Sequence, residues 1–359
     1  RRPSAPPEPV LRRIREAVHR HRLLRDHARL VNDGCLFDAT YASEWIDHPT
    51  SDDYWQRISP CTYFHRIRIP VFLIGGWFDF FIEGVLRAFQ EIQAPKKLVV
   101  GPWFHGEDAG MNRTKLRLRW FDYWLKGVDN GIMDEPPVQY YLLGKGTWQE
   151  STSWPPPART LSLYFGPGEG PSDRSLNGGS LSPQPPTGGP FADRITHDPN
   201  SPVPSIGFRK VDIGRAEAAM LTYTTGSLSH DLEVVGQPKL HLVFSTNSQD
   251  VDWIAKLTQV SSDGRSTVFS SGALRGSHHL SHQLPQKLVP NTVYEADIAL
   301  APIAKVFDKG SRLRLDVSNS DFPILFPSNI PSESRIHLGE PKPSYLELPV
   351  VGRADFHLV

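Results

Sequence analysis

The sequence predicts an α/β unit with a parallel sheet, followed by an antiparallel β-sandwich. In residues 67–135, two apolar, β-rich runs alternate with two segments of helical periodicity. This order favours a parallel sheet joined by right-handed crossovers. In residues 136–359, turns rich in Pro and Gly separate many short strand candidates, which is typical of a sandwich. Residues 1–66 contain no segment that alternates as a strand does, so we expect helices and irregular chain there.

The first zone opens with an Arg-rich segment at residues 9–30. Its apolar residues Leu11, Ile14, Val18 and Leu24 recur at near-helical spacing, which predicts a helix. A solvated basic helix face explains the arginines better than an arm that binds nucleic acid. The aromatic and acidic stretch that follows predicts short helices at best.

The second zone supplies the predicted parallel sheet. "VFLIGG" and "KLVVGPW" are continuous apolar runs, the pattern of strands buried on both faces. Between them, "FIEGVLRAFQEIQ" carries apolar residues at helical spacing. After them, "KLRLRWFDYWLKGVDNG" predicts a second helix that ends at Gly127. The expected buried face of this helix consists of Leu118, Phe121, Trp124 and Leu125.

The third zone contains the strands of the predicted sandwich. Between two strand candidates, "SSDGRS" carries the Asp-Gly pair of a tight hairpin turn. Several candidates alternate apolar and polar residues, as strands with one buried face do. The candidates are "RTLSLYF", "MLTYTTG", "PKLHLVFSTN", "DWIAKLTQV", "TVFSSGALRG", "TVYEADIAL" and "SRLRLDVSNS".

Composition narrows the class of protein. The 359 residues suit two domains, and the 39 basic residues balance the 39 acidic ones. Net charge therefore gives no reason to expect nucleic acid or an acidic membrane as partner. No stretch reaches the ~18 apolar residues of a membrane span. Cys35 and Cys61 make no disulfide framework, so we expect reduced thiols, although a single bridge stays open.

The N-terminus shows no targeting signal. "RRPSAPPEP" lacks the apolar core of a signal peptide, which slightly favours a cytoplasmic protein. It also lacks an initiator Met, so it need not be the natural start.

A polar, titratable side chain follows each of the two predicted core strands. Asp79 comes after the first strand and His105 after the second. Ligands bind beyond the carboxyl ends of parallel strands, and a carboxylate beside an imidazole orients it and stabilises its protonated form. Asp79 and His105 are thus candidates for the acid and base of a nucleophilic triad, in the chain order of α/β-hydrolases. The alternative is a turn-capping Asp and a packed surface His.

The third member of such a triad, the nucleophile, is missing from the predicted position. A nucleophile elbow of the type G-x-S-x-G is expected before Asp79. Ser4, Ser43, Ser51 and Ser59 have neither flanking glycines nor a preceding strand, and Cys61 follows "ISP". Two hypotheses follow. The chain is the C-terminal portion of a longer protein or complex, or its active site has degenerated.

Several blocks together resemble the CocE/NonD hydrolases, a family of esterases, X-Pro dipeptidyl-peptidases and acylases. The resemblance runs from about residue 44 to the C-terminus. Its most specific motifs are "GGWFD" and "GPWFH". Further matching blocks are "HPTSDDYWQRISP", "LRWFDYWLKGVDNGIMDEPPVQYYLLGKGTWQES", "DPNSPVPSIG", "DLEVVGQPKLHLVFSTNSQDVDWIAKLTQVSSDGRS" and "VFDKGSRLRLDVSNSDFP".

The resemblance implies a fold and two catalytic roles. Asp79 matches the triad acid of the family and His105 the triad base. Residues 1–66 would be the end of a helical cap and its return to the core, and residues 67–135 the C-terminal part of an α/β-hydrolase core. Residues 136–359 would be a jelly-roll-like sandwich. The family's serine elbow and oxyanion tyrosine have no counterpart in this sequence.

Aromatic residues flank the candidate pair. Apolar side chains line most ligand pockets, so Trp77, Phe78, Phe80, Trp103 and Phe104 are candidates for an acyl pocket. Core packing is an equally good explanation for each of them.

A second candidate for substrate binding is the acidic segment "DDYW" at residues 52–55. Asp53 and Trp55, with their neighbours Asp52 and Tyr54, would face the site and bind a substrate amine. Capping of a helix N-terminus is the favoured alternative for this segment.

The sequence predicts neither a metal site nor a cofactor. His278, His279 and His282 lie close together, but their spacing matches no zinc signature and no Cys or acidic residue accompanies them. A solvated loop explains them better. No phosphate-binding G-x-x-x-x-G-K-[ST] loop occurs.

The favoured function is that of a serine hydrolase which cleaves an ester or amide, such as an acyl ester or an X-Pro peptide. We expect a small-molecule ester or peptide substrate, and either an N-terminal hydrolase half or a second copy as partner. The alternative is a non-catalytic module or degenerate hydrolase, whose sandwich binds carbohydrate or a partner protein; fold alone decides neither.

Overall fold

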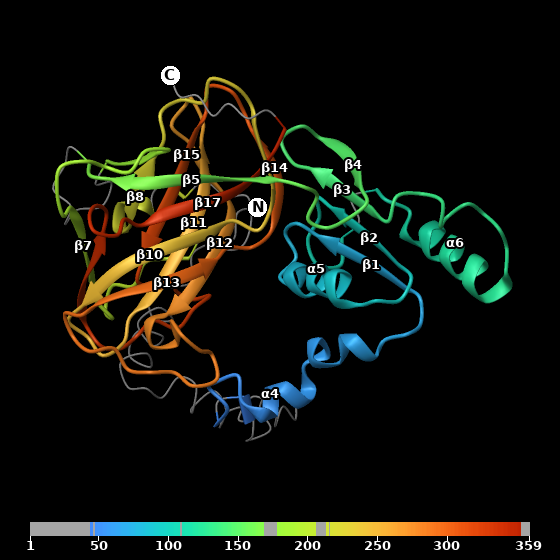
Figure 1. Cartoon of the computed structure of the whole chain (residues 1–359), viewed down its shortest axis with the longest axis horizontal. Coiled ribbons are helices and arrows are strands. Elements are labelled where there is room, and N and C mark those ends of the chain that lie inside the picture. The colour runs from blue at the N-terminus through green and yellow to red at the C-terminus, as the bar shows by residue number, and fades with distance from the viewer. Residues whose placement is uncertain are drawn as a thin grey trace, which may run out of the picture.

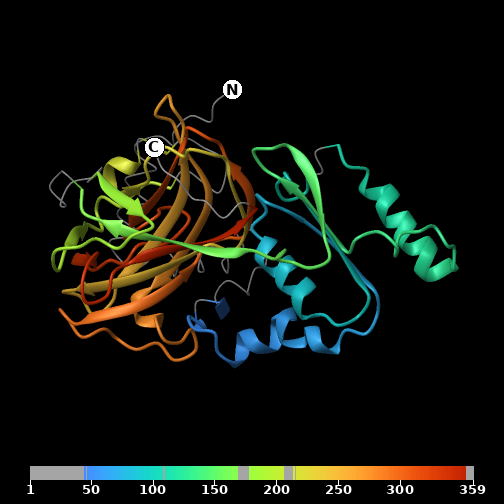
Figure 2. The same cartoon turned by 45° about the horizontal axis from the view of Figure 1, so that its top comes forward.

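The computed structural model consists of a small α/β unit and a larger β-sandwich that pack against each other (Figures 1 and 2). It describes residues 44–352, apart from residues 46, 108–109, 169–177, 206–212 and 215. The helix predicted for residues 9–30 and Cys35 therefore lie outside the described residues. Cys61 is a free, half-buried thiol.

The α/β unit is built on a four-stranded sheet with the strand order β1-β2-β3-β4. Its strands are β1 (Val71–Gly76), β2 (Lys96–Gly101), β3 (Val138–Leu142) and β4 (Thr147–Ser151). β1, β2 and β3 run parallel, and β4 pairs antiparallel with β3. The predicted parallel sheet is confirmed.

The sheet continues beyond residue 135, where the sequence predicted that the α/β unit ends. β3 pairs with β2 over Val138 to Tyr140, so it belongs to the parallel sheet and not to the sandwich. The burial of β3 alternates along the strand, like that of the sandwich strands, and the sequence pattern therefore did not separate them. The sheet ends at Ser151 of β4.

The helices before and between the first two strands follow the sequence pattern. α5 (Ile82–Glu91) forms the crossover between β1 and β2 and buries Ile82, Leu86 and Phe89 in the core of the unit. Before β1, the chain forms only α4 (Asp53–Ile58) and the 3₁₀ helix η1 (Pro60–Arg66), both short, as expected.

The helix α6 (Arg113–Lys126) ends at Gly127 as predicted, but it buries a different face. Gly127 adopts a left-handed conformation (φ 68°), which glycine accommodates without strain. The buried residue is Trp120, which packs on Phe72 of β1. The predicted apolar face is exposed, because no described element covers it: Leu118, Phe121 and Leu125 are 50–76% accessible. In both views α6 stands away from the rest of the molecule.

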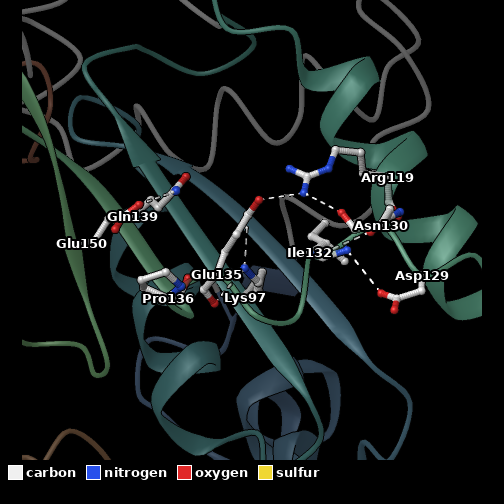
Figure 3. A network of polar contacts seen from close by, with 10 residues as sticks. Lys97, Arg119, Asp129, Asn130, Ile132, Glu135, Pro136, Gln139 and Glu150 are labelled. Atoms are coloured by element: carbon white, nitrogen blue, oxygen red, sulfur yellow. Dashed lines mark hydrogen bonds and ion pairs between the residues drawn. The ribbon is translucent and has the colours of Figure 1, made fainter.

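A polar network anchors α6 and the following loop to β2 (Figure 3). Glu135 accepts hydrogen bonds from Arg119 of α6 (2.7 Å) and from Lys97 of β2 (3.4 Å). The side chain of Asn130 donates to the Arg119 carbonyl, and Arg119 donates to the Asn130 carbonyl. These contacts, with the packing of Trp120, attach α6 to the sheet.

The sandwich contains the remaining thirteen strands of the described part, all paired antiparallel except β6 with β8. The predicted hairpin joins β11 to β12, where Ser261 donates its backbone N–H to the Arg265 carbonyl. The strands are β5 (Arg159–Gly166), β6 (Gly179–Ser182), β7 (Ala192–His197), β8 (Leu221–Thr224), β9 (Leu232–Gly236), β10 (Lys239–Thr246), β11 (Asp252–Val260), β12 (Ser266–Arg275), β13 (Val293–Ala299), β14 (Ile303–Phe307), β15 (Arg312–Ser318), β16 (Ser332–His337) and β17 (Tyr345–Val351), with the 3₁₀ turns η2 (Glu217–Ala219) and η3 (Gly276–His278).

The two parts of the molecule share one apolar cluster. Val235 of β9 and Ala304 and Val306 of β14 pack with the core residues of the α/β unit. Leu143, just after β3, exchanges backbone hydrogen bonds with Ala304 and Val306. The sandwich is therefore fixed against the sheet.

Two glycines make room for Trp103 at the carboxyl ends of β1 and β2. A Cβ atom on Gly101 would overlap the Trp103 ring, and one on Gly76 would overlap the Trp103 carbonyl. The ring is 3% exposed. The glycines of the two sequence motifs therefore serve a close approach, which sets the path of the loop after β2.

We expect Gly101→Ala to destabilise the protein, because overpacking of a rigid site costs about 1–3 kcal/mol. Gly84→Ala is the matched control: a Cβ atom there meets nothing within 4 Å, so the alanine should stabilise helix α5 by up to about 1 kcal/mol. Thermal unfolding followed by circular dichroism measures both changes. Equal melting temperatures for the two variants would contradict this role of Gly101.

Candidate active site

Asp79 and His105 lie together beyond the carboxyl ends of β1 and β2. The Nδ1 atom of His105 is 3.1 Å from Oδ2 of Asp79. The Asp79 side chain is 16% exposed and that of His105 is 59% exposed. When Nδ1 donates to the carboxylate, Nε2 is left to accept a proton from a third group. The geometry therefore supplies an oriented imidazole.

Backbone hydrogen bonds hold the two loops in place. After β1, Trp77 donates to the Gly101 carbonyl (2.9 Å) and Phe78 to the Trp103 carbonyl (3.3 Å). Asp79 closes a tight turn by donating to the Gly76 carbonyl (3.0 Å). The loop that carries Asp79 is thus bonded to the loop that carries His105.

The second carboxylate oxygen of Asp79 is also used. Oδ1 accepts the backbone N–H of Phe81 at the start of α5 (2.9 Å). One oxygen thus binds the imidazole and the other binds the backbone, which fixes the orientation of the carboxylate.

Four phenylalanines surround the pair. Phe78 stacks on Phe104 with ring centroids 5.1 Å apart. The rings of Phe80 and Phe81 lie 5.2 and 5.4 Å from His105 and are more than half exposed. The sequence analysis missed Phe81; its place two residues after Asp79, at the start of the predicted helix, was the available signal.

The two tryptophans are packing residues in this structure. Trp77 is 5% exposed and donates its indole N–H to the Tyr141 carbonyl (2.6 Å). Trp103 fills the space over the strand ends, as described above. Trp77 still contributes one edge to a hollow beside Asp79.

The acidic segment around Asp53 lies elsewhere. Asp52 is the N-cap of α4 and accepts from the Tyr54 backbone, and its hydrogen bond from His48 lowers its pKa. Trp55 donates to the His48 carbonyl (2.7 Å), and Asp53 sits in the first turn of α4. No contact in the described part joins Asp53 or Trp55 to Asp79 or His105, so their role in substrate binding stays a prediction.

Two hollows flank the loop after β1, each with one wall from the sandwich. The smaller, about 160 Å³, lies between residues 77–83 and the sandwich residues Lys256, Phe269, Asp321 and Ile324. The larger, about 630 Å³, has walls from Pro102 and Tyr141 and from sandwich residues that include Gln259, Arg265 and Lys305. Phe78 and Phe269 border both hollows. The sequence analysis found none of these sandwich residues, because no local pattern marks them.

The histidines near residue 280 form no metal centre in the structure. The rings of His278 and His282 are 5.7 Å apart, and His279 bonds the Gly276 carbonyl. The described ranges hold no group of three or more metal-ligating side chains. None of the helices in these ranges is long and apolar enough to cross a membrane.

A nucleophile is not in reach of His105 within the described part of the chain. The interactions of its ring there are with Asp79, Phe80 and Phe81, and none is with a serine or cysteine.

Two family models match the chain. The model of the X-Pro dipeptidyl-peptidase C-terminal non-catalytic domain covers residues 130–347, and the model of the X-Pro dipeptidyl-peptidase (S15 family) covers residues 2–107. The cocaine esterase of Rhodococcus sp. is 29% identical, over 86% of this chain and 61% of the esterase. The chain spans between 55% and 61% of the length of the first curated relatives it matches.

Solved structures agree in fold. An α-amino acid ester hydrolase superposes with a TM-score of 0.78 at 23% identity, over 91% of this chain and 63% of the other. An aminopeptidase from a marine sediment Thaumarchaeota archaeon also has a TM-score of 0.78, at 22% identity, over 88% and 61% of the two chains. A CocE/NonD family hydrolase from Staphylococcus aureus follows at 0.69 and 20% identity, over 87% and 59%.

These similarities bear out the fold class predicted from the sequence: part of an α/β-hydrolase sheet followed by a β-sandwich. The chain belongs to the CocE/NonD and X-Pro dipeptidyl-peptidase family of hydrolases.

Proposed function

We propose that this chain supplies the acid and the base of a serine hydrolase that cleaves an ester or peptide bond. The observation that carries the proposal is the hydrogen-bonded pair of Asp79 and His105 at the carboxyl ends of two adjacent parallel strands. Family membership adds support, since the relatives bear the names of esterases, ester hydrolases and peptidases.

In the proposed reaction, His105 moves the proton. Its Nε2 takes the proton of a serine hydroxyl as the serine attacks the carbonyl carbon, and it then gives that proton to the leaving group. Asp79 holds the imidazole in the required tautomer and stabilises its protonated form. A water molecule, activated by the same imidazole, releases the acyl group from the serine.

The serine would come from polypeptide outside these residues, and the free edge of the sheet favours the side of β1. Within the described residues β1 pairs only with β2. Residues 71–74 of β1, an apolar run typical of a strand buried on both faces, are only half-buried. A further parallel strand at this edge would cover them, remove the unpaired backbone groups and end beside His105. The exposed face of α6, on the β1 side, would gain cover as well.

Replacing either proposed catalytic residue should nearly abolish hydrolysis of a p-nitrophenyl ester by the natural gene product, including whatever precedes Arg1. For Asp79→Asn we expect a loss of about 10⁴ in kcat, because the imidazole would adopt the wrong tautomer. His105→Ala should lose at least as much. His65→Ala and Asp122→Asn, on the surface of the same unit, are the controls. Activity within a few-fold of the natural protein would rule out the assignment.

A fluorophosphonate probe, which reacts with activated serines, tests the origin of the nucleophile. The natural gene product should be labelled and the present chain alone should not, because no serine of its described part contacts His105. Mass spectrometry locates the labelled residue. Stoichiometric labelling of the chain alone would show that it contains the nucleophile, and an unlabelled natural product would favour a degenerate hydrolase or a binding module.

A further inference from the structure

A buried ion pair from the sandwich lies in the small hollow beside Asp79. Lys256 of β11 donates to Oδ1 of Asp321 at 2.6 Å, and the two side chains are 6% and 9% exposed. Both residues border the hollow of about 160 Å³ whose other wall is the loop that carries Asp79. A pair of charges thus lies one side chain away from the proposed triad acid.

The position of the pair is well defined by its surroundings. Lys256 stands opposite Asp316 in the register of β11 and β15. Burial, and then the nearby Glu217, raises the pKa of Asp316 well above its ordinary value, so Asp316 favours its neutral form. Asp321 is therefore the charged partner of Lys256.

The loop that carries Asp321 is tied down on both sides. Leu325 donates its backbone N–H to the Asp321 carbonyl, and Phe322 donates to the Val203 carbonyl. The Ser320 hydroxyl accepts the Val203 N–H. The Asp321 carboxylate is therefore presented on a fixed loop.

The pair retains hydrogen-bonding capacity on the side of the hollow. An ammonium group has three donors, and in the described part of the chain Lys256 uses one of them, on Asp321. Asp321 uses one of its two carboxylate oxygens in the same bond. The hollow is thus offered N–H donors and an acceptor oxygen side by side, between walls that are mainly apolar: Phe78, Phe80, Val268, Phe269 and Ile324.

This combination fits a neutral group that both accepts and donates. A carboxylate would be drawn to Lys256 but repelled by Asp321, Asp79 and Glu83, and a lone ammonium would meet the charge of Lys256. An amide satisfies both partners without adding charge to a desolvated site.

We propose that this hollow is a substrate subsite that binds an amide group, with the amide carbonyl accepting from Lys256 and the amide N–H donating to Asp321. The inference rests on the proposed hydrolase function. The amide belongs to the acyl part of the substrate, because the leaving group takes its proton from His105 and departs beside that exposed ring, whereas the hollow is enclosed by the sandwich.

The test uses the natural gene product and two series of p-nitrophenyl esters. In one series the acyl chain ends in a carboxamide, and in the other it ends in the isosteric isopropyl group, over several chain lengths. At the best chain length we expect kcat/KM to favour the amide by about tenfold or more, the size expected for hydrogen bonds to charged groups. Lys256→Met should remove this preference and leave the isopropyl ester within about twofold, the range of a variant that still folds.

Two further variants separate recognition from stability. Lys256→Met combined with Asp321→Asn avoids an unpaired buried charge and should show the same loss of preference. Arg275→Met, which breaks the more exposed Arg275–Asp252 pair at the other end of β11, is the control and should keep the preference. An amide preference that survives in both Lys256 variants, or that is absent from the natural protein, would overturn the proposal.

Binding of hexanamide, followed by saturation-transfer NMR, gives a readout that does not depend on hydrolysis. If neither ester series is hydrolysed, the proposed function fails, and binding that is lost in the Lys256 variants would still support the subsite. No binding by the natural protein would overturn it.

Discussion

The candidate site depends on the in-register parallel pairing of β1 and β2. The two strands are equally long, and their pairing runs from Val71 with Lys96 to Gly76 with Gly101, so both end at the same level. The chain then turns at once on each side, and backbone bonds from Trp77 and Phe78 join the two turns. A shift of one residue would separate the carboxylate from the imidazole, and it would also remove the space that Gly76 and Gly101 leave for Trp103.

The features that the sequence predicted well are those set by short-range pattern. Apolar runs, helical spacing and the glycines of the two motifs were enough to infer the β1–α5–β2 unit and the proximity of Asp79 and His105. The same reasoning was wrong about the face of α6 that is buried, because periodicity indicates an apolar face and not the element that covers it. It ended the sheet too early, because β3 alternates as the sandwich strands do.

The remainder of the site could not be read from local pattern. Lys256, Phe269 and Asp321 reach the loop after β1 only through the packing of the sandwich on the α/β unit, and no motif marks them as partners of Asp79. Phe269 packs against the core of the sandwich and against the core of the α/β unit. The sandwich is therefore part of the wall of the site as well as its support.

The backbone pairing of Leu143 with β14 has a consequence for how the protein comes apart and how it changes over generations. Since the sheet and the sandwich share main-chain hydrogen bonds and one apolar cluster, disruption of either exposes the interior of the other, which favours a single cooperative transition over independent melting. The sandwich is consequently a poor unit for exchange between relatives. A transplanted one would have to match the shapes of Val235, Ala304 and Val306, so residues on the two sides of this seam must be substituted in concert.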